Sequence, residues 1–151
     1  MRLRDTLTNR FLEHPLRNLT VEQIAERLGR NGHKLERIFA ATKDSPANRK
    51  LLSHITGIER WGQSRLRVAL GAGLTMDEYD GYRPPQEATW SELQDAFRST
   101  RQETVGLARQ LGQAMAAGVR APHNQFGPLT MRSWLRYLDM HANVEAKKLR
   151  S

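Results

Sequence analysis

The sequence predicts an all-α fold, a four-helix bundle whose helices are joined by long crossover connections. Apolar residues recur at intervals of three and four along several long segments, as in amphipathic helices. Prolines fall between these segments, and no apolar–polar alternation is long enough to require a strand. The 151 residues, 38% of them hydrophobic, fit a single domain over residues 1–151.

The first helical segment covers about residues 2–40 and is interrupted at His14-Pro15. Its second half begins at Thr20, which opens a capping box and so satisfies free backbone amides at the helix start. Gly29 and Gly32 predict a break or bend within that half, because glycine weakens a helix interior. The residues expected to face inward are Ile24, Leu28, Leu35 and Ile38.

The second helix begins at Ser45, a favourable N-cap, and runs to about Leu70, where Gly71 suits a C-cap. A polar connection over residues 74–88 follows, and its length predicts a crossover. The third helix opens with a capping box at Thr89. The residues that predict its bundle face are Leu93, Phe97, Thr100, Thr104, Leu107, Leu111 and Met115.

The last helix is expected over about residues 131–149, after a loop at 118–130 and an N-cap at Thr130. Its inward stripe combines apolar residues with one histidine and one acid, and so does not read as a purely apolar core face. The members of the stripe are Trp134, Leu138, His141, Glu145 and Leu149.

Three polar residues on the apolar stripes are candidate metal ligands. His54 shares a helix face with Ile58 and Trp61, while His141 and Glu145 lie one helical turn apart. Two imidazoles and a carboxylate can hold a divalent ion inside a bundle, and the ion offsets the cost of the buried charge. Such an ion could activate water. The alternative is that the histidines are hydrogen-bonded and the glutamate forms an ordinary ion pair.

Short motifs in the second half of the chain carry a resemblance to a known family. They are residues 51–61, residues 79–85, Trp90 at a helix start, His123-Asn124 before Gly127-Pro128, and residues 141–149. Together they resemble the DinB/YfiT-like family over about residues 45–150, with a poorer match before that. The resemblance implies a four-helix bundle with a metal held by one histidine of the second helix and an H-x-x-x-H pair of the fourth.

On this resemblance, His54 and His141 match the first two family ligands, and Glu145 stands where the family has its third histidine. A set of two histidines and one carboxylate suits Zn, Ni, Mn or Fe(II). The resemblance further implies a thiol-dependent transferase or a metal-dependent hydrolase acting on a small-molecule or thiol substrate. A second interpretation is a non-catalytic bundle whose site has decayed at Glu145, serving as a binding or stress-response module.

A third interpretation concerns residues 19–46, which resemble an AraC-type helix-turn-helix. Residues 20–28 would form its first helix, Gly29 its turn and residues 33–39 its recognition helix. The net charge of +8 and the pI near 10.6 favour a polyanionic partner such as DNA. Against DNA binding, only one such unit is present and the cationic residues are scattered.

The remaining expectations concern location, partners and loop residues. No cysteine is present, which excludes disulfides and thiolate nucleophiles in this chain. The start of the sequence lacks a secretory signal and no apolar run could cross a bilayer, so a cytoplasmic protein without a membrane partner is expected. Helix faces favour a homodimer. His123 is expected to make a loop hydrogen bond, and Tyr79 and Tyr82 to cover the core or line an entrance.

Overall fold

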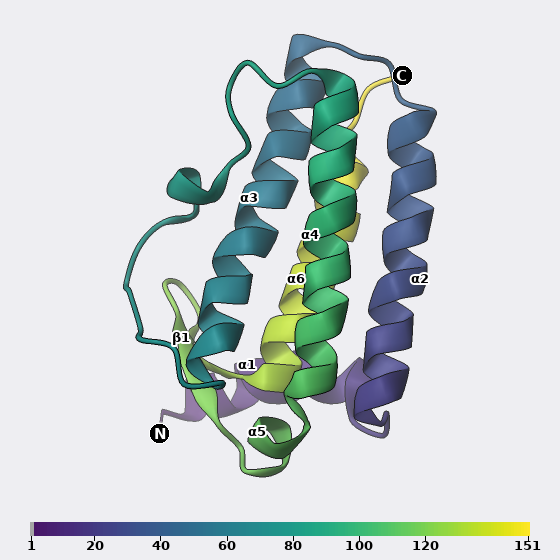
Figure 1. Cartoon of the computed structure of the whole chain (residues 1–151). Helices are drawn as coiled ribbons and strands as arrows, with labels where there is room; N and C mark the ends of the chain where they lie inside the picture. The colour runs from purple at the N-terminus through teal and green to yellow at the C-terminus, as the bar shows by residue number, and fades with distance from the viewer. Residues whose placement is uncertain (1) are drawn as a thin grey trace.

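Four long helices form the body of the protein, which the computed structural model describes over residues 2–151 (Figure 1). Helices α2 and α6 run in one direction and α3 and α4 in the other. Both α2 and α3 pack against α4 and α6, so the four helices close into a ring. The all-α prediction with long connections is confirmed. The four helices are α2 (Val21–Ala40), α3 (Pro46–Val68), α4 (Trp90–Gln110) and α6 (Met131–Ala146).

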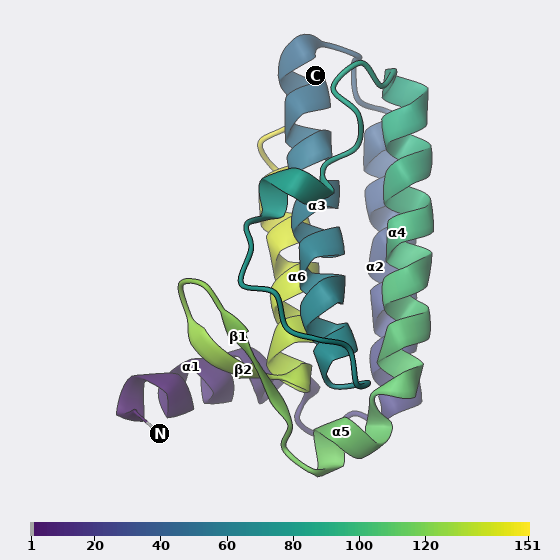
Figure 2. The ribbon, with the colours of Figure 1, turned by 60° about the vertical axis from the view of Figure 1, so that its left-hand side comes forward.

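Smaller elements lie at one end of this bundle and along the long connection between α3 and α4, called the crossover. Figure 2 shows α1 lying across the base of the bundle, beside a two-stranded hairpin. The crossover between α3 and α4 climbs the outside of the bundle and carries a short 3-10 helix, η2. These elements are α1 (Leu3–Glu13), the 3-10 helix η1 (His14–Leu16), η2 (Tyr79–Tyr82), α5 (Gly112–Ala116), β1 (Arg120–His123) and β2 (Gly127–Thr130). Among residues 2–151 no helix is long and apolar enough to cross a membrane.

The interior of α2 differs from the sequence-based expectation. The helix is continuous over Val21–Ala40, so Gly29 and Gly32 do not break it and the helix-turn-helix interpretation of residues 19–46 is wrong. Gly32 instead permits a close approach, because a Cβ there would lie 2.6 Å from Cγ of Arg101. Leu35 is buried as expected, whereas Ile38 is 45% exposed and faces outward.

Two element boundaries and the hairpin also correct the expectations. The third helix ends at Gln110, before α5 begins, and the last helix ends at Ala146 rather than near residue 149. Strands β1 and β2 pair antiparallel, with Pro122 opposite Pro128. Each strand has only four residues, which is too short for an alternating pattern to be detected in the sequence.

The core consists of two apolar clusters at different levels of the bundle. The cluster at the α1 end includes Leu28, Trp61, Leu107, Trp134 and Leu138. The other cluster includes Leu35, Phe39, Leu52, Phe97 and Ala142. In each of α2, α4 and α6, polar residues separate the two clusters, so a polar layer crosses the bundle.

The guanidinium of Arg101 is the centre of this polar layer. Its Nε donates to Oε1 of Glu59 at 2.7 Å, and Nη1 donates to Oδ1 of Asp139 at 3.0 Å and to the carbonyl of Leu28 at 3.1 Å. Asn31 donates to the other oxygen of Asp139 at 2.7 Å. One buried side chain of α4 thus bonds to groups from α2, α3 and α6 and fixes the relative positions of all four helices.

Gly62 sets how closely α3 approaches α6. A Cβ at this position would lie 2.4 Å from Cδ2 of the buried Leu138. We therefore expect Gly62→Ala to lower the free energy of unfolding in urea by about 1–3 kcal/mol through overpacking. The control is Gly106→Ala in α4, where a Cβ would meet nothing within 4 Å and about 0.5–1 kcal/mol of stabilisation is expected. Changes of the same sign in both variants would contradict this account.

Candidate functional site

Helices α3 and α6 bring the two stripe histidines face to face. The Nε2 atoms of His54 and His141 are 3.2 Å apart, and the ring centroids are 5.0 Å apart. Glu145 lies one turn beyond His141, and one donor atom from each of the three residues lies within 4.8 Å of the others. The structure therefore brings together all three candidate ligands, each of them half-buried.

The surroundings keep both imidazoles neutral and the carboxylate ionised at neutral pH. Burial and the nearby His54 lower the pKa of His141 to about 4, and burial also lowers the pKa of His54. Burial alone would raise the pKa of Glu145, but the hydrogen bond from Lys148 and the field of His141 outweigh it, and that pKa is lowered. The cluster thus offers two imidazole lone pairs and one negative charge.

Two tyrosines flank the histidine pair. The Tyr79 ring meets His54 edge-on with 5.0 Å between centroids, and the Tyr137 ring lies 5.9 Å from that of His141. Burial raises the pKa of Tyr137 to about 12, so its phenol keeps its proton. Tyr79 comes from η2 in the crossover, so the crossover forms one wall of the site.

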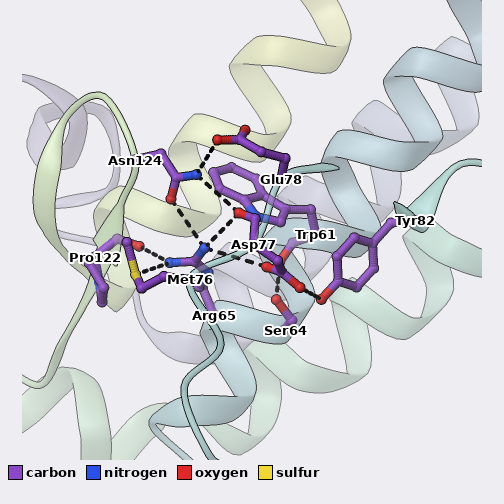
Figure 3. A network of polar contacts seen from close by, with 9 residues as sticks. All are labelled: Trp61, Ser64, Arg65, Met76, Asp77, Glu78, Tyr82, Pro122 and Asn124. Atoms are coloured by element: carbon purple, nitrogen blue, oxygen red, sulfur yellow. Dashed lines mark hydrogen bonds and ion pairs between the residues drawn. The ribbon is translucent and has the colours of Figure 1, made fainter. Parts of the chain in front are cut away.

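Arg65 of α3 anchors the start of this crossover (Figure 3). Its guanidinium donates to the carbonyl of Pro122 at 2.7 Å, to Oδ1 of Asn124 at 3.2 Å and to the carbonyl of Asp77 at 3.3 Å. The same Asp77 carbonyl accepts from Nε1 of Trp61 at 3.1 Å and from Nδ2 of Asn124 at 3.0 Å. The crossover, the hairpin and α3 are therefore joined at one point.

Two further contacts hold the crossover against α3. The hydroxyl of Tyr82 donates to the carboxylate of Asp77 at 2.6 Å, which fixes η2 relative to the anchored segment. Gly57 lets the chain come close, because a Cβ there would lie 2.9 Å from Cγ of Arg83. These contacts place Tyr79 on His54.

A helical bundle with this pair of facing histidines can be compared with known families. A family model described as the DinB superfamily matches residues 4–144. The chain belongs to the DinB superfamily. The match includes α1 and α2, although the resemblance in the sequence covered only about residues 45–150, and it ends one residue before Glu145. Comparisons with curated proteins and with solved structures found no significant match.

His123 of this DinB bundle lies near the histidine pair and has a separate role. Its Nδ1 accepts hydrogen bonds from the backbone amides of Gln125 at 3.0 Å and Phe126 at 3.2 Å. Its ring also stacks on Phe126, with 4.5 Å between centroids. The expected loop hydrogen bond is confirmed, and it closes the turn between β1 and β2.

The sequence did not reveal the buried ionic residues of this DinB bundle, Arg101, Glu59 and Asp139, because charged residues in helices usually face solvent. A signal was nevertheless present. Arg101 lies four residues after the buried Phe97, and the two acids follow buried apolar residues at the same interval. Arg65 lies four residues after Trp61 and so on the same face of α3, but its partners lie in loops whose paths are not evident from periodicity.

Proposed function

We propose that the protein binds one divalent metal ion through His54, His141 and Glu145 and uses it to act on a small-molecule substrate. The 3.2 Å between the two Nε2 atoms carries the proposal. Two nitrogens on a tetrahedral ion at 2.0–2.1 Å lie about 3.3–3.4 Å apart, so one ion fits between these rings with little adjustment.

The protonation states and the family support this proposal. Both imidazoles are neutral at pH 7 and the carboxylate is ionised, which are the forms that bind a cation. Members of the DinB superfamily commonly hold a divalent metal. A carboxylate in place of the third family histidine keeps three donors, and two nitrogens with one oxygen suit Zn, Ni, Mn or Fe(II).

The chemistry proposed for the site is hydrolysis or thiol-dependent group transfer. A divalent ion there supplies Lewis acidity, and three protein donors leave part of its coordination sphere for substrate. The chain contributes the surroundings: Tyr79 shields one side of the histidine pair from water. Tyr137 keeps its proton at neutral pH and can donate a hydrogen bond. The homodimer and the cytoplasmic location stay predictions.

Elemental analysis tests the metal site directly. Protein purified without a histidine tag and incubated with Zn, Ni, Mn and Fe(II) in turn is expected to retain about one ion per chain with at least one metal. His54→Ala and His141→Ala are expected to lose that ion. His33→Ala, at an exposed position of α2, is the control and should retain it. Wild-type protein that retains none of the four metals would contradict the proposal.

The decayed-site alternative has two observations in its favour: the Nε2 atoms of His54 and His141 lie within hydrogen-bond distance of each other, and Glu145 already has a partner. Oε1 of Glu145 already accepts a hydrogen bond from Nζ of Lys148 at 2.9 Å, so the carboxylate has a partner without any metal. Glu145→His restores the family pattern and separates the two interpretations. If wild-type protein binds no ion and this variant binds one, the site has decayed and the protein is a non-catalytic module of the binding or stress-response kind.

A further inference from the structure

A cavity of about 950 Å³ opens beside the candidate metal cluster. One wall is the first third of α3 as far as Ser53, the residue before His54. The crossover over residues 80–86 and Leu93 of α4 also line the cavity. Small-molecule sites have volumes of about 300–1,000 Å³, so the cavity has the size for a metabolite rather than a macromolecule.

The charged groups of the cavity leave two cations available. Arg49 is paired with Asp44 at 2.6 and 2.7 Å, and Nε of Arg83 donates to Asp80 at 3.1 Å. The terminal nitrogens of Arg83 and Nζ of Lys50 have no ion pair among residues 2–151. Both acids of the cavity are thus already engaged, whereas one arginine fork and one ammonium group remain for a ligand.

The position of Arg83 is determined by its neighbours. The backbone and the first side-chain atoms of Arg83 lie against α3 at Gly57, which has no side chain to obstruct them. Its Cζ lies 5.4 Å from the centroid of the Tyr79 ring, and that ring lies 5.0 Å from the ring of His54. A single tyrosine ring therefore separates the guanidinium from the first candidate ligand.

The first turn of α3 adds to the positive potential of the cavity. Ser45 and Pro46, the N-cap and first residue of this helix, line the cavity. The N-terminal end of a helix carries a partial positive charge, and a helix of 23 residues has a fully developed dipole. The free cations and the helix terminus that line the cavity both favour a negatively charged ligand.

We propose that this cavity binds the carboxylate or phosphate group of a small anionic substrate, with Arg83 and Lys50 as its binding residues. The further claim that the rest of this substrate extends past Tyr79 towards His54 rests on the proposed function above. Binding of the anion itself does not require a metal ion.

Anion titrations of the folded protein test the proposal. Binding of inorganic phosphate and of succinate is followed by NMR chemical shifts at ionic strength held constant with NaCl, with and without bound zinc. Arg83→Gln and Lys50→Gln are each expected to weaken binding of at least one probe by about tenfold or more, because each loses a charged hydrogen bond. Phosphate and succinate distinguish a phosphate ligand from a carboxylate ligand.

Matched controls separate the cavity from the general attraction of a protein with a net charge of +8. Arg98→Gln removes an exposed, ion-paired arginine, and Lys147→Gln an exposed lysine, both outside the cavity. Equal weakening in the controls, or wild-type affinity in both cavity variants, overturns the proposal. Arg83→Lys keeps the positive charge but loses the guanidinium fork, so an affinity between those of wild type and Arg83→Gln is expected. This variant serves as the test if Arg83→Gln folds poorly. Anion binding without metal retention would remove the proposed function and leave this site standing.

Discussion

Replacing Arg101 by methionine is expected to lower the free energy of unfolding by about 3–5 kcal/mol. The substitution keeps most of the side-chain volume but leaves the carboxyl groups of Glu59 and Asp139 buried without their cation. Burial already raises the pKa of Glu59, so this carboxyl would then bind a proton more readily. The free energy of unfolding of a small protein is about 5–15 kcal/mol, so this loss would be a large part of the total stability.

Urea denaturation followed by circular dichroism measures the effect of Arg101→Met. The control is Arg98→Met on the same helix, whose exposed ion pairs with Glu36 and Asp95 should contribute less than about 1 kcal/mol. Adding Glu59→Gln and Asp139→Asn to Arg101→Met should recover part of the loss, because the uncompensated charges are removed. A loss below 1 kcal/mol in Arg101→Met would show that the polar layer does not hold the helices together.

The second large effect is acid destabilisation through His123. Burial and the nearby Arg65 lower the pKa of this imidazole from 6.5 to about 4 in the folded protein. The unfolded chain therefore binds a proton first, and stability is complete above pH 6.5 and falls as the pH drops towards 4. At about 1.4 kcal/mol for each pKa unit, this one group should remove about 3 kcal/mol over that interval.

Unfolding measured at several pH values isolates this contribution. In His123→Asn the side-chain oxygen can still accept the amides of the turn but does not titrate, so stability should fall less steeply with acid than in wild-type protein. His33→Asn removes an exposed histidine and should follow the wild-type curve. Parallel curves for wild type and His123→Asn would mean that the buried imidazole is not neutral in the native state.

The helices and their starts could be predicted because each start depends on residues adjacent in the sequence. Thr20, Ser45, Thr89 and Thr130 all cap a helix through their side-chain oxygens, as expected. The hairpin could not be predicted, because each strand has only four residues and the pair packs against α1, α3 and α6, which are distant in the sequence.

The candidate site was partly predictable for a similar reason. His54, His141 and Glu145 interrupt apolar stripes, and helical periodicity places them on inward faces. Periodicity gives the face of a helix but not its neighbours, so it left open whether Tyr79 of the crossover would cover the core or line the entrance to the site. The destination of a long connection is fixed by single contacts such as those of Arg65, which have no period in the sequence.

The hydrogen bonds to the carbonyl oxygen of Asp77 couple the motions of two loops. It accepts hydrogen bonds from Trp61 and Arg65 of α3 and from Asn124 of the hairpin loop. A fluctuation that lifts the crossover from α3 must also break the hydrogen bond between Asp77 and Asn124 of the hairpin loop. The two loops therefore open as one cooperative unit rather than fraying independently, and transient exposure of the histidine pair is coupled to motion near the base of the molecule.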